Sequence, residues 1–94
     1  MKAKLVEYAK TTDEAGNTIE VKIWQVPKDR HRPHGYKYSL VYIVNNERVI
    51  GYDNSEGKGD HKHHRGKEAA YEFKNADKLF RDFYHDIRRF KNES

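Results

Sequence analysis

The sequence contains no cysteine, no long hydrophobic run and no apolar stretch at its start. The absence of cysteine excludes disulfide bonds and thiolate metal sites. Residues 1–8 lack the apolar core of a signal peptide, and no apolar run approaches the length needed to cross a membrane. We therefore expect a cytoplasmic protein with no membrane segment.

Length and composition describe one small basic domain, residues 1–94. Charged residues make up 36% of the chain, yet the apolar residues fall in periodic clusters, which is typical of a folded domain with a charged surface. Two histidine-containing segments, residues 27–37 and 58–67, gather many of the cations behind the net charge of +4. They favour a polyanion partner such as RNA, and the alternative is a solvated surface. The candidate nucleic-acid-binding residues are Arg30, Arg32, Lys37, Arg65 and Lys67.

Alternating apolar and polar residues predict the strands of this domain. They cover residues 3–10, 18–26, 36–44 and 48–52, and a short fifth strand can return over residues 68–73. The segment 36–44 carries apolar residues on both faces towards its end. We therefore expect it at the centre of the sheet.

A single amphipathic helix is predicted over residues 76–91, with Asn75 as its N-cap. Its apolar stripe comprises Leu79, Phe80, Phe83, Tyr84, Ile87 and Phe90. The predicted fold class is α+β: an antiparallel β-meander of four to five strands with one C-terminal amphipathic helix packed on one face.

The polar segment of residues 52–67 is where we look for function, because it has no apolar residue after Tyr52 and holds three of the six histidines. Successive side chains of an extended segment face opposite ways. If residues 60–65 are extended, His61, His63 and Arg65 share one face.

Two imidazoles and a guanidinium suit metal-independent cleavage of RNA. One histidine takes the proton of the 2′-OH, another group protonates the leaving 5′-oxygen, and Lys58 or Arg65 holds the phosphoryl oxygens. The candidate catalytic residues are Asp60, His61, His63 and Lys58, with no cofactor.

Other readings of the same segment stay open. Asp53, Asp60, His61 and His63 include ligands suited to a divalent ion, although four nearby cations oppose a metal. A metal would make the protein a metal-dependent nuclease or nucleotidyl enzyme. Alternatively, the basic surface binds nucleic acid without cutting it, or the histidines have no role.

The segment also resembles a known family. Tyr52-Asp53-Asn54, Gly57-Lys58-Gly59-Asp60-His61 and His63 resemble the motif of the TumE toxins. The segments 34–38 and 71–73, together with Leu79 and Asp82-Phe83, resemble that family's central strand, closing element and helix. The chain departs from the pattern at His64, where an apolar residue is expected, and at Ala70, where proline is common.

This resemblance implies a small cytoplasmic toxin with a cognate antitoxin as its partner. RNA cleavage is inferred from the residue chemistry and agrees with the resemblance. We expect Asp60 and His61 to be needed for toxicity, with His63 next and His85 as a surface control. Lys37, Lys58 and Arg65 are expected to line one positive groove between the two basic segments.

Overall fold

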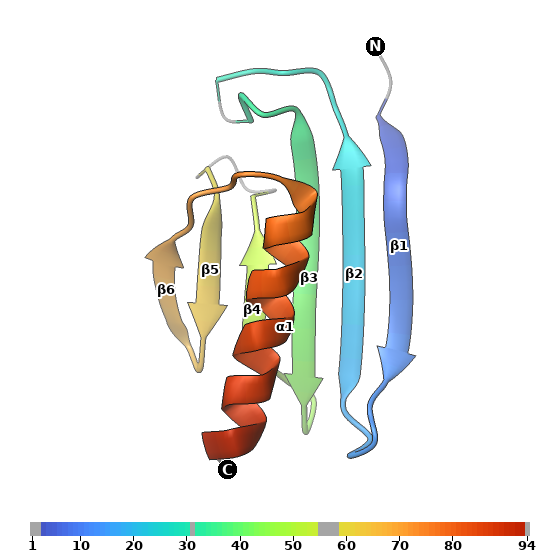
Figure 1. The fold of residues 1–94 in the computed structure, drawn as a ribbon, viewed down its shortest axis with the longest axis vertical. Helices are drawn as coiled ribbons and strands as arrows, with labels where there is room; N and C mark the ends of the chain where they lie inside the picture. Colours follow the sequence, from blue (N-terminus) through green and yellow to red (C-terminus); the bar gives the residue numbers. More distant parts are fainter. Residues whose placement is uncertain (1–2, 31, 55–58, 94) are drawn as a thin grey trace.

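The computed structural model describes residues 3–30, 32–54 and 59–93. They form a six-stranded antiparallel sheet with one helix on one face (Figure 1). Each strand pairs with its neighbours in the sequence, in the order β1-β2-β3-β4-β5-β6. The elements are β1 (Lys4–Thr12), β2 (Thr18–Gln25), β3 (Tyr36–Val44), β4 (Glu47–Asp53), β5 (His61–His64), β6 (Lys67–Ala70) and α1 (Ala76–Glu93). The predicted α+β meander is confirmed, with one or two strands more than expected.

The turns between the strands follow from their residues. At the β1–β2 turn, Asp13 Oδ1 accepts the backbone N–H groups of Ala15 and Asn17 at 3.0 and 2.9 Å. The β3–β4 turn consists of Asn45 and Asn46, both with positive φ, which is the geometry that a two-residue hairpin turn requires.

Residues 61–64 of the polar segment, for which no strand was predicted, form β5. Arg65 and Gly66 have φ of 51° and 85° and close a second tight hairpin to β6. β5 also pairs along β4, so its backbone groups are satisfied although its side chains are polar. The last strand is therefore Lys67–Ala70, where a strand over residues 68–73 was expected.

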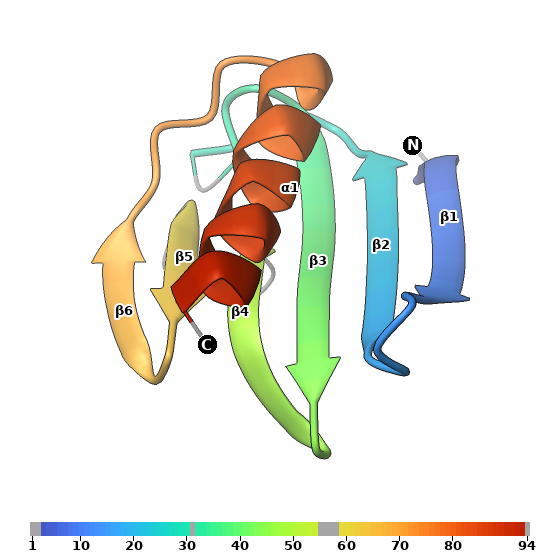
Figure 2. The same ribbon diagram turned by 60° about the horizontal axis from the view of Figure 1, so that its bottom comes forward.

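The helix α1 begins after Asn75, whose side-chain Oδ1 accepts the N–H of Lys78 at 2.8 Å, as an N-cap does. It lies across β3 and β4 (Figures 1 and 2). Of its predicted stripe, Leu79, Phe83 and Ile87 are buried, whereas Tyr84 at the margin is exposed.

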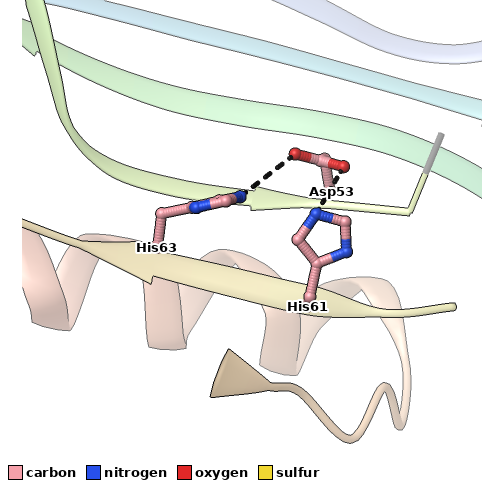
Figure 3. Close-up of side chains that lie close together, drawn as sticks. All are labelled: Asp53, His61 and His63. Atoms are coloured by element: carbon pink, nitrogen blue, oxygen red, sulfur yellow. Dashed lines mark ion pairs between the residues drawn. The ribbon is translucent and has the colours of Figure 1, made fainter. Parts of the chain in front are cut away.

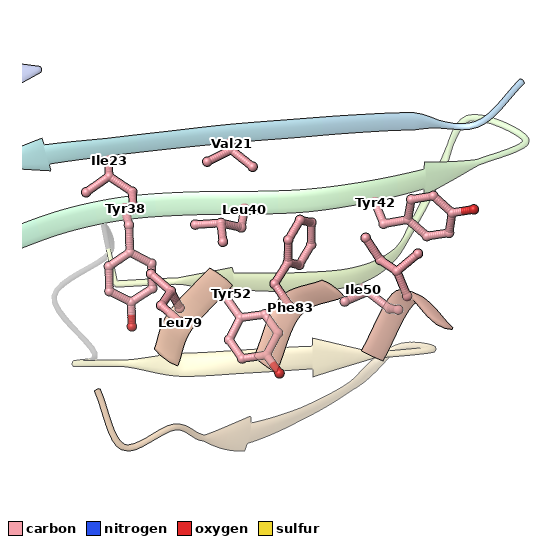
Figure 4. Packing of buried hydrophobic residues seen from close by; sticks show 10 residues of the cluster. Val21, Ile23, Tyr38, Leu40, Tyr42, Ile50, Tyr52, Leu79 and Phe83 are labelled. Carbon is pink, nitrogen blue, oxygen red and sulfur yellow. The ribbon is translucent and has the colours of Figure 1, made fainter. Parts of the chain in front are cut away.

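The core lies between α1 and the centre of the sheet. β3 is central, as predicted, and turns Tyr38, Leu40 and Tyr42 towards the helix (Figure 4). Val21 and Ile23 of β2, together with Ile50 and Tyr52 of β4, complete the sheet side of the cluster. Burial of these large side chains is the main source of stability in a domain of this size.

The helix covers only one face of the sheet, and all nine residues of β1 are exposed. Within the described ranges, the opposite face has no helix over it. We call this the open face. Among those residues, too, no helix has the length and apolar character to cross a membrane.

Candidate functional site

Strand alternation divides the histidines of β5 between the two faces of the sheet. His61 pairs with Asp53 of β4, and His63 pairs with Gly51. His61 and His63 therefore point to the open face, while Lys62 lies near the Tyr52 ring on the helix side. The prediction that His61 and His63 share a face is confirmed by their contacts with Asp53 (Figure 3).

Asp53, His61 and His63 form a compact group at the centre of this site. The distance from His61 Nε2 to Asp53 Oδ1 is 3.0 Å, and that from His63 Nε2 to Asp53 Oδ2 is 3.8 Å (Figure 3). One ligand atom from each of the three residues lies within 4.8 Å of the others. His61 and Asp53 are only 4% and 7% exposed, so their polar atoms are largely shielded from water.

The hydrogen bonds of this group are incomplete. His61 Nδ1 lies 3.1 Å from the carbonyl oxygen of Gly59, and because a carbonyl only accepts, Nδ1 carries the proton of this bond. Asp53 Oδ1 is buried and makes no hydrogen bond with any described residue, although His61 Nε2 is close to it. His61 Nε2 and Asp53 Oδ1 are close but not aligned for a hydrogen bond. A buried carboxylate oxygen without a hydrogen bond is energetically unfavourable and calls for an explanation.

The surroundings of His63 favour the neutral form of its imidazole. Burial lowers the pKa of His63 below its usual value, and the positive charge of Arg48 lowers it further. Its Nε2 lies 3.6 Å from the carboxylate of Glu68 on β6. A neutral imidazole at this position can accept a proton or ligate a metal.

Basic and aromatic residues adjoin the group on the open face. The register places Lys22, Ser39, Asp53 and His61 in one row across β2, β3, β4 and β5. A pocket of about 290 Å³ lies beside this row, lined by Lys22, Trp24, Lys37, Tyr38 and Ser39. Trp24 is partly exposed there, directly opposite Lys37.

Arg48 also reaches the group. Its guanidinium Nη1 lies 3.9 Å from Asp53 Oδ2. The side chain passes over Gly51, where an added Cβ would stand 3.0 Å from Arg48 Cδ. A side chain at position 51 would therefore require the Arg48 side chain to shift by a few tenths of an ångström.

Asp60 is separated from His61 and His63 and joins a different cluster. Its Oδ1 accepts hydrogen bonds from the Tyr38 hydroxyl at 2.8 Å and from Asn54 Nδ2 at 3.1 Å. His34 Nε2 lies 3.0 Å from both carboxylate oxygens. Among the described residues, the histidine beside Asp60 is therefore His34. Whether Asp60 is needed for toxicity stays a prediction.

Two of the five expected nucleic-acid-binding cations, Arg65 and Lys67, lie on the helix side of the sheet. Arg65 is not beside His63, because β5 ends at His64 and the Arg65 guanidinium stacks 4.3 Å from the Phe90 ring of the helix. Lys67 pairs with His64 and so shares the helix side. Arg32 donates from Nη1 to the Asn54 carbonyl, and Arg30 is exposed.

The expected groove does not form as one surface. Lys37 is on the open face, whereas Arg65 contacts the helix on the other side of the sheet. Lys58 falls outside the described residues, as does His31.

Sequence reasoning missed Lys22, Trp24 and Arg48 as parts of the site. The alternation of Glu20, Lys22 and Trp24 along β2 was the available signal, since it places them together on the face opposite Val21 and Ile23. Asp53 was considered only as a metal ligand. Its position beside His61 depends on the β4–β5 register.

The comparisons with known proteins give one match. The family model described as Toxin TumE matches residues 3–91, so the match includes the first hairpin as well as the polar segment. No curated protein and no solved structure matches the chain.

Proposed function

Because the chain belongs to the TumE family of toxins, we propose that it acts on RNA in the cytoplasm as the ribonuclease toxin of a toxin–antitoxin pair. The family implies an antitoxin as its protein partner. The target and the chemistry are inferred from the open face of the sheet.

The observation that carries the proposal is the position of Asp53, His61 and His63 beside the basic and aromatic pocket of Lys22, Trp24 and Lys37. Lysine ammonium groups attract the phosphates of a nucleic acid, and an exposed indole ring can stack on an unpaired base. The open face therefore offers both a binding surface for single-stranded RNA and reactive groups at its end.

The route without a metal, expected from the sequence, uses the two imidazoles. Neutral His63 removes the proton of a 2′-OH, whose oxygen forms a bond to the adjacent phosphorus. The bond from phosphorus to the 5′-oxygen breaks, and protonated His61 gives its proton to that oxygen. The products are a 2′,3′-cyclic phosphate and a 5′-hydroxyl end. Lys58 stays the candidate for holding the phosphoryl oxygens.

The rival function is a module that binds nucleic acid without cutting it. The same cations would support it, because phosphate binding needs no acid–base group. The two functions differ in whether the histidines of the open face are required.

The test compares variants from neighbouring positions of one strand. His63→Ala removes a group from the open face, and His64→Ala removes the same group from the helix side. We expect His63→Ala to lower the rate of RNA cleavage by about 10²–10⁴-fold and to relieve growth inhibition, whereas His64→Ala cleaves like the unaltered protein. Circular dichroism checks that both variants are folded.

Two results would overturn the proposal. One is RNA binding without cleavage by the unaltered protein, which supports the binding module. The other is full cleavage by folded His63→Ala, which places the reaction elsewhere.

A further inference from the structure

We propose that Asp53, His61 and His63 bind a divalent transition-metal ion, with Zn²⁺, Mn²⁺ and Co²⁺ as the class of ligand. This inference rests on the proposed function only for the role of the ion in RNA cleavage. Binding itself follows from the arrangement of the three side chains.

The first argument is the orientation of His61. Since its Nδ1–H donates to the Gly59 carbonyl, a neutral His61 has a lone pair on Nε2. This lone pair and the lone pairs of Asp53 Oδ1 are 3.0 Å apart. Two buried acceptors at this distance repel each other unless a cation lies between them. Metal-bound histidines have the same arrangement, with the second ring nitrogen donating to a backbone carbonyl or a carboxylate.

Protonation of His61 offers a weaker explanation of the same contact. A proton on Nε2 would form a hydrogen bond to Asp53 Oδ1, but this oxygen makes no hydrogen bond with any residue in the described part of the chain. A metal ion between the two atoms does not require an N–H group directed at the carboxylate oxygen. An ion would bind a lone pair of each ligand, so Nε2 and Oδ1 would be directed at the ion and not at each other.

The distances and the donor atoms fit a transition metal. Metal bonds of about 2.0–2.1 Å to nitrogen and oxygen place adjacent ligand atoms roughly 3.0–3.4 Å apart. The pair His61 Nε2 and Asp53 Oδ1 is at this separation, and the set lies within 4.8 Å. Two imidazoles and one carboxylate leave coordination positions for water or a phosphate oxygen. Mg²⁺ and Ca²⁺ favour all-oxygen ligand sets instead.

Most of the cations of the polar segment, whose charges would repel a metal ion, lie on the helix side of the sheet. Lys62 lies near the ring of Tyr52, Arg65 stacks on Phe90, and Lys67 is paired with His64. Among the described residues of the polar segment, none of the cations approaches the carboxylate of Asp53. Arg48 from the start of β4 does so at 3.9 Å, and its side chain is 44% exposed, so water screens its charge.

A bound ion would supply a reactive water at neutral pH and neutralise charge on the phosphate. His61 and His63 would then hold the ion and could not transfer protons. If the site binds a metal, the proposed ribonuclease is metal-dependent. The sequence analysis left this alternative open.

The binding test uses full-length protein without an affinity tag, stripped with EDTA and dialysed. Isothermal titration calorimetry with Zn²⁺ measures affinity and stoichiometry, and the visible absorption of added Co²⁺ reports its coordination. We expect one ion per chain. Asp53→Asn and His63→Gln should each weaken binding by about 100-fold or more.

His34→Ala is the matched control, since it removes a histidine from the other aspartate–histidine cluster, and it should bind Zn²⁺ like the unaltered protein. His61→Gln serves as a further ligand variant if either of the first two is unfolded by circular dichroism. The inference is overturned if Zn²⁺ does not saturate one site. It is also overturned if the folded ligand variants retain full affinity or if His34→Ala loses it.

Cleavage assays with and without EDTA separate this inference from the proposed function. One bound ion with no RNA cleavage supports the metal site and overturns the ribonuclease. Cleavage that survives EDTA, with no site for Zn²⁺, supports the ribonuclease and overturns the metal site. Cleavage lost with EDTA and restored by Zn²⁺ or Mn²⁺ supports both.

Discussion

The sheet carries two aspartate–histidine clusters on opposite faces, and they differ in how completely the carboxylate is bonded. Asp60, on the helix side, accepts hydrogen bonds from Tyr38 and Asn54 and lies 3.0 Å from His34 Nε2. Asp53, on the open face, has a buried oxygen with no hydrogen bond to any described residue. A satisfied buried carboxylate contributes to stability, whereas an unsatisfied one needs a ligand or a proton.

We therefore expect the same pair of residue types to serve two purposes in one small domain. Asp60 ties three segments together, since Tyr38 belongs to β3, Asn54 follows β4 and His34 precedes β3. The Tyr38 hydroxyl stays protonated, because burial and the hydrogen bond to Asp60 both raise its pKa. Activity should depend on Asp53 and stability on Asp60.

The largest expected effect is on catalysis, through Asp53→Asn. This change keeps the shape of the side chain but removes the charge that faces His61 and His63. RNA cleavage should fall by about 10²–10⁴-fold, the range for loss of one positioned reactive group. Single-turnover cleavage measures the change. A folded Asp53→Asn protein with unchanged cleavage would contradict the assignment of the two clusters.

The next effect is on stability, through Asp60→Ala. It leaves the buried Tyr38 hydroxyl without its acceptor, so the free energy of unfolding should fall by about 1–3 kcal/mol in urea titrations. Tyr38→Phe breaks the same bond from the donor side. If Asp60→Ala is as stable as the unaltered protein and loses only toxicity, Asp60 has the catalytic role predicted from the sequence.

A third carboxylate, that of Asp13, extends the comparison to the stability of the domain at low pH. Asp13 accepts a hydrogen bond from the Tyr42 hydroxyl at 2.6 Å, and this bond, with those from the backbone of Asn17 and Ala15 and from Lys91, lowers its pKa from 3.8 to about 2 despite the opposing effect of desolvation. A lowered pKa means that the folded state binds the proton more weakly than the unfolded state does. Its stabilising contribution is complete above pH 4 and is lost as the pH falls towards 2.

Urea unfolding between pH 5 and pH 2 tests this expectation. Asp13→Asn should flatten part of the acid decline that the unaltered protein shows. An equal decline in both proteins would mean that Asp13 does not contribute in this pH range.

The smallest effect concerns Arg48→Gln. Removing a cation 3.9 Å from Asp53 Oδ2 should tighten Zn²⁺ binding by about two- to five-fold, since a half-exposed ion pair contributes under about 1 kcal/mol. Calorimetry measures the affinity, with Arg88→Gln on the exposed side of the helix as control. Weaker binding in Arg48→Gln would show that Arg48 supports the site instead of competing with the ion.

The sequence predicted the layers of this domain better than its site. Alternation identified β3 with its observed bounds, and the apolar residues on both of its faces indicated its central position. Asn75 marked the start of the helix. β5 was missed because a strand of four polar residues has no apolar alternation. The strand forms because its backbone pairs with β4, and this pairing cannot be read from the four residues of β5 alone.

The partners of the two aspartates could not be assigned from the sequence for a similar reason. Asp60 and His61 are adjacent in sequence, but alternation sends their side chains to opposite faces, and the partners of each come from other elements. His34 reaches Asp60 from 26 positions away, and Asp53 reaches His61 through the β4–β5 register. Spacing within the polar segment could not show either contact.

The place of the helix at the end of the meander has a consequence for the synthesis of the protein. A ribosome delivers all six strands before it delivers Leu79, Phe83 and Ile87, which form the helix side of the core. Until those residues emerge, Tyr38, Leu40 and Tyr42 face water, and such partly folded chains tend to aggregate. Because the sheet gains its stable form only when the helix docks, the nascent chain acquires its open-face site late in translation.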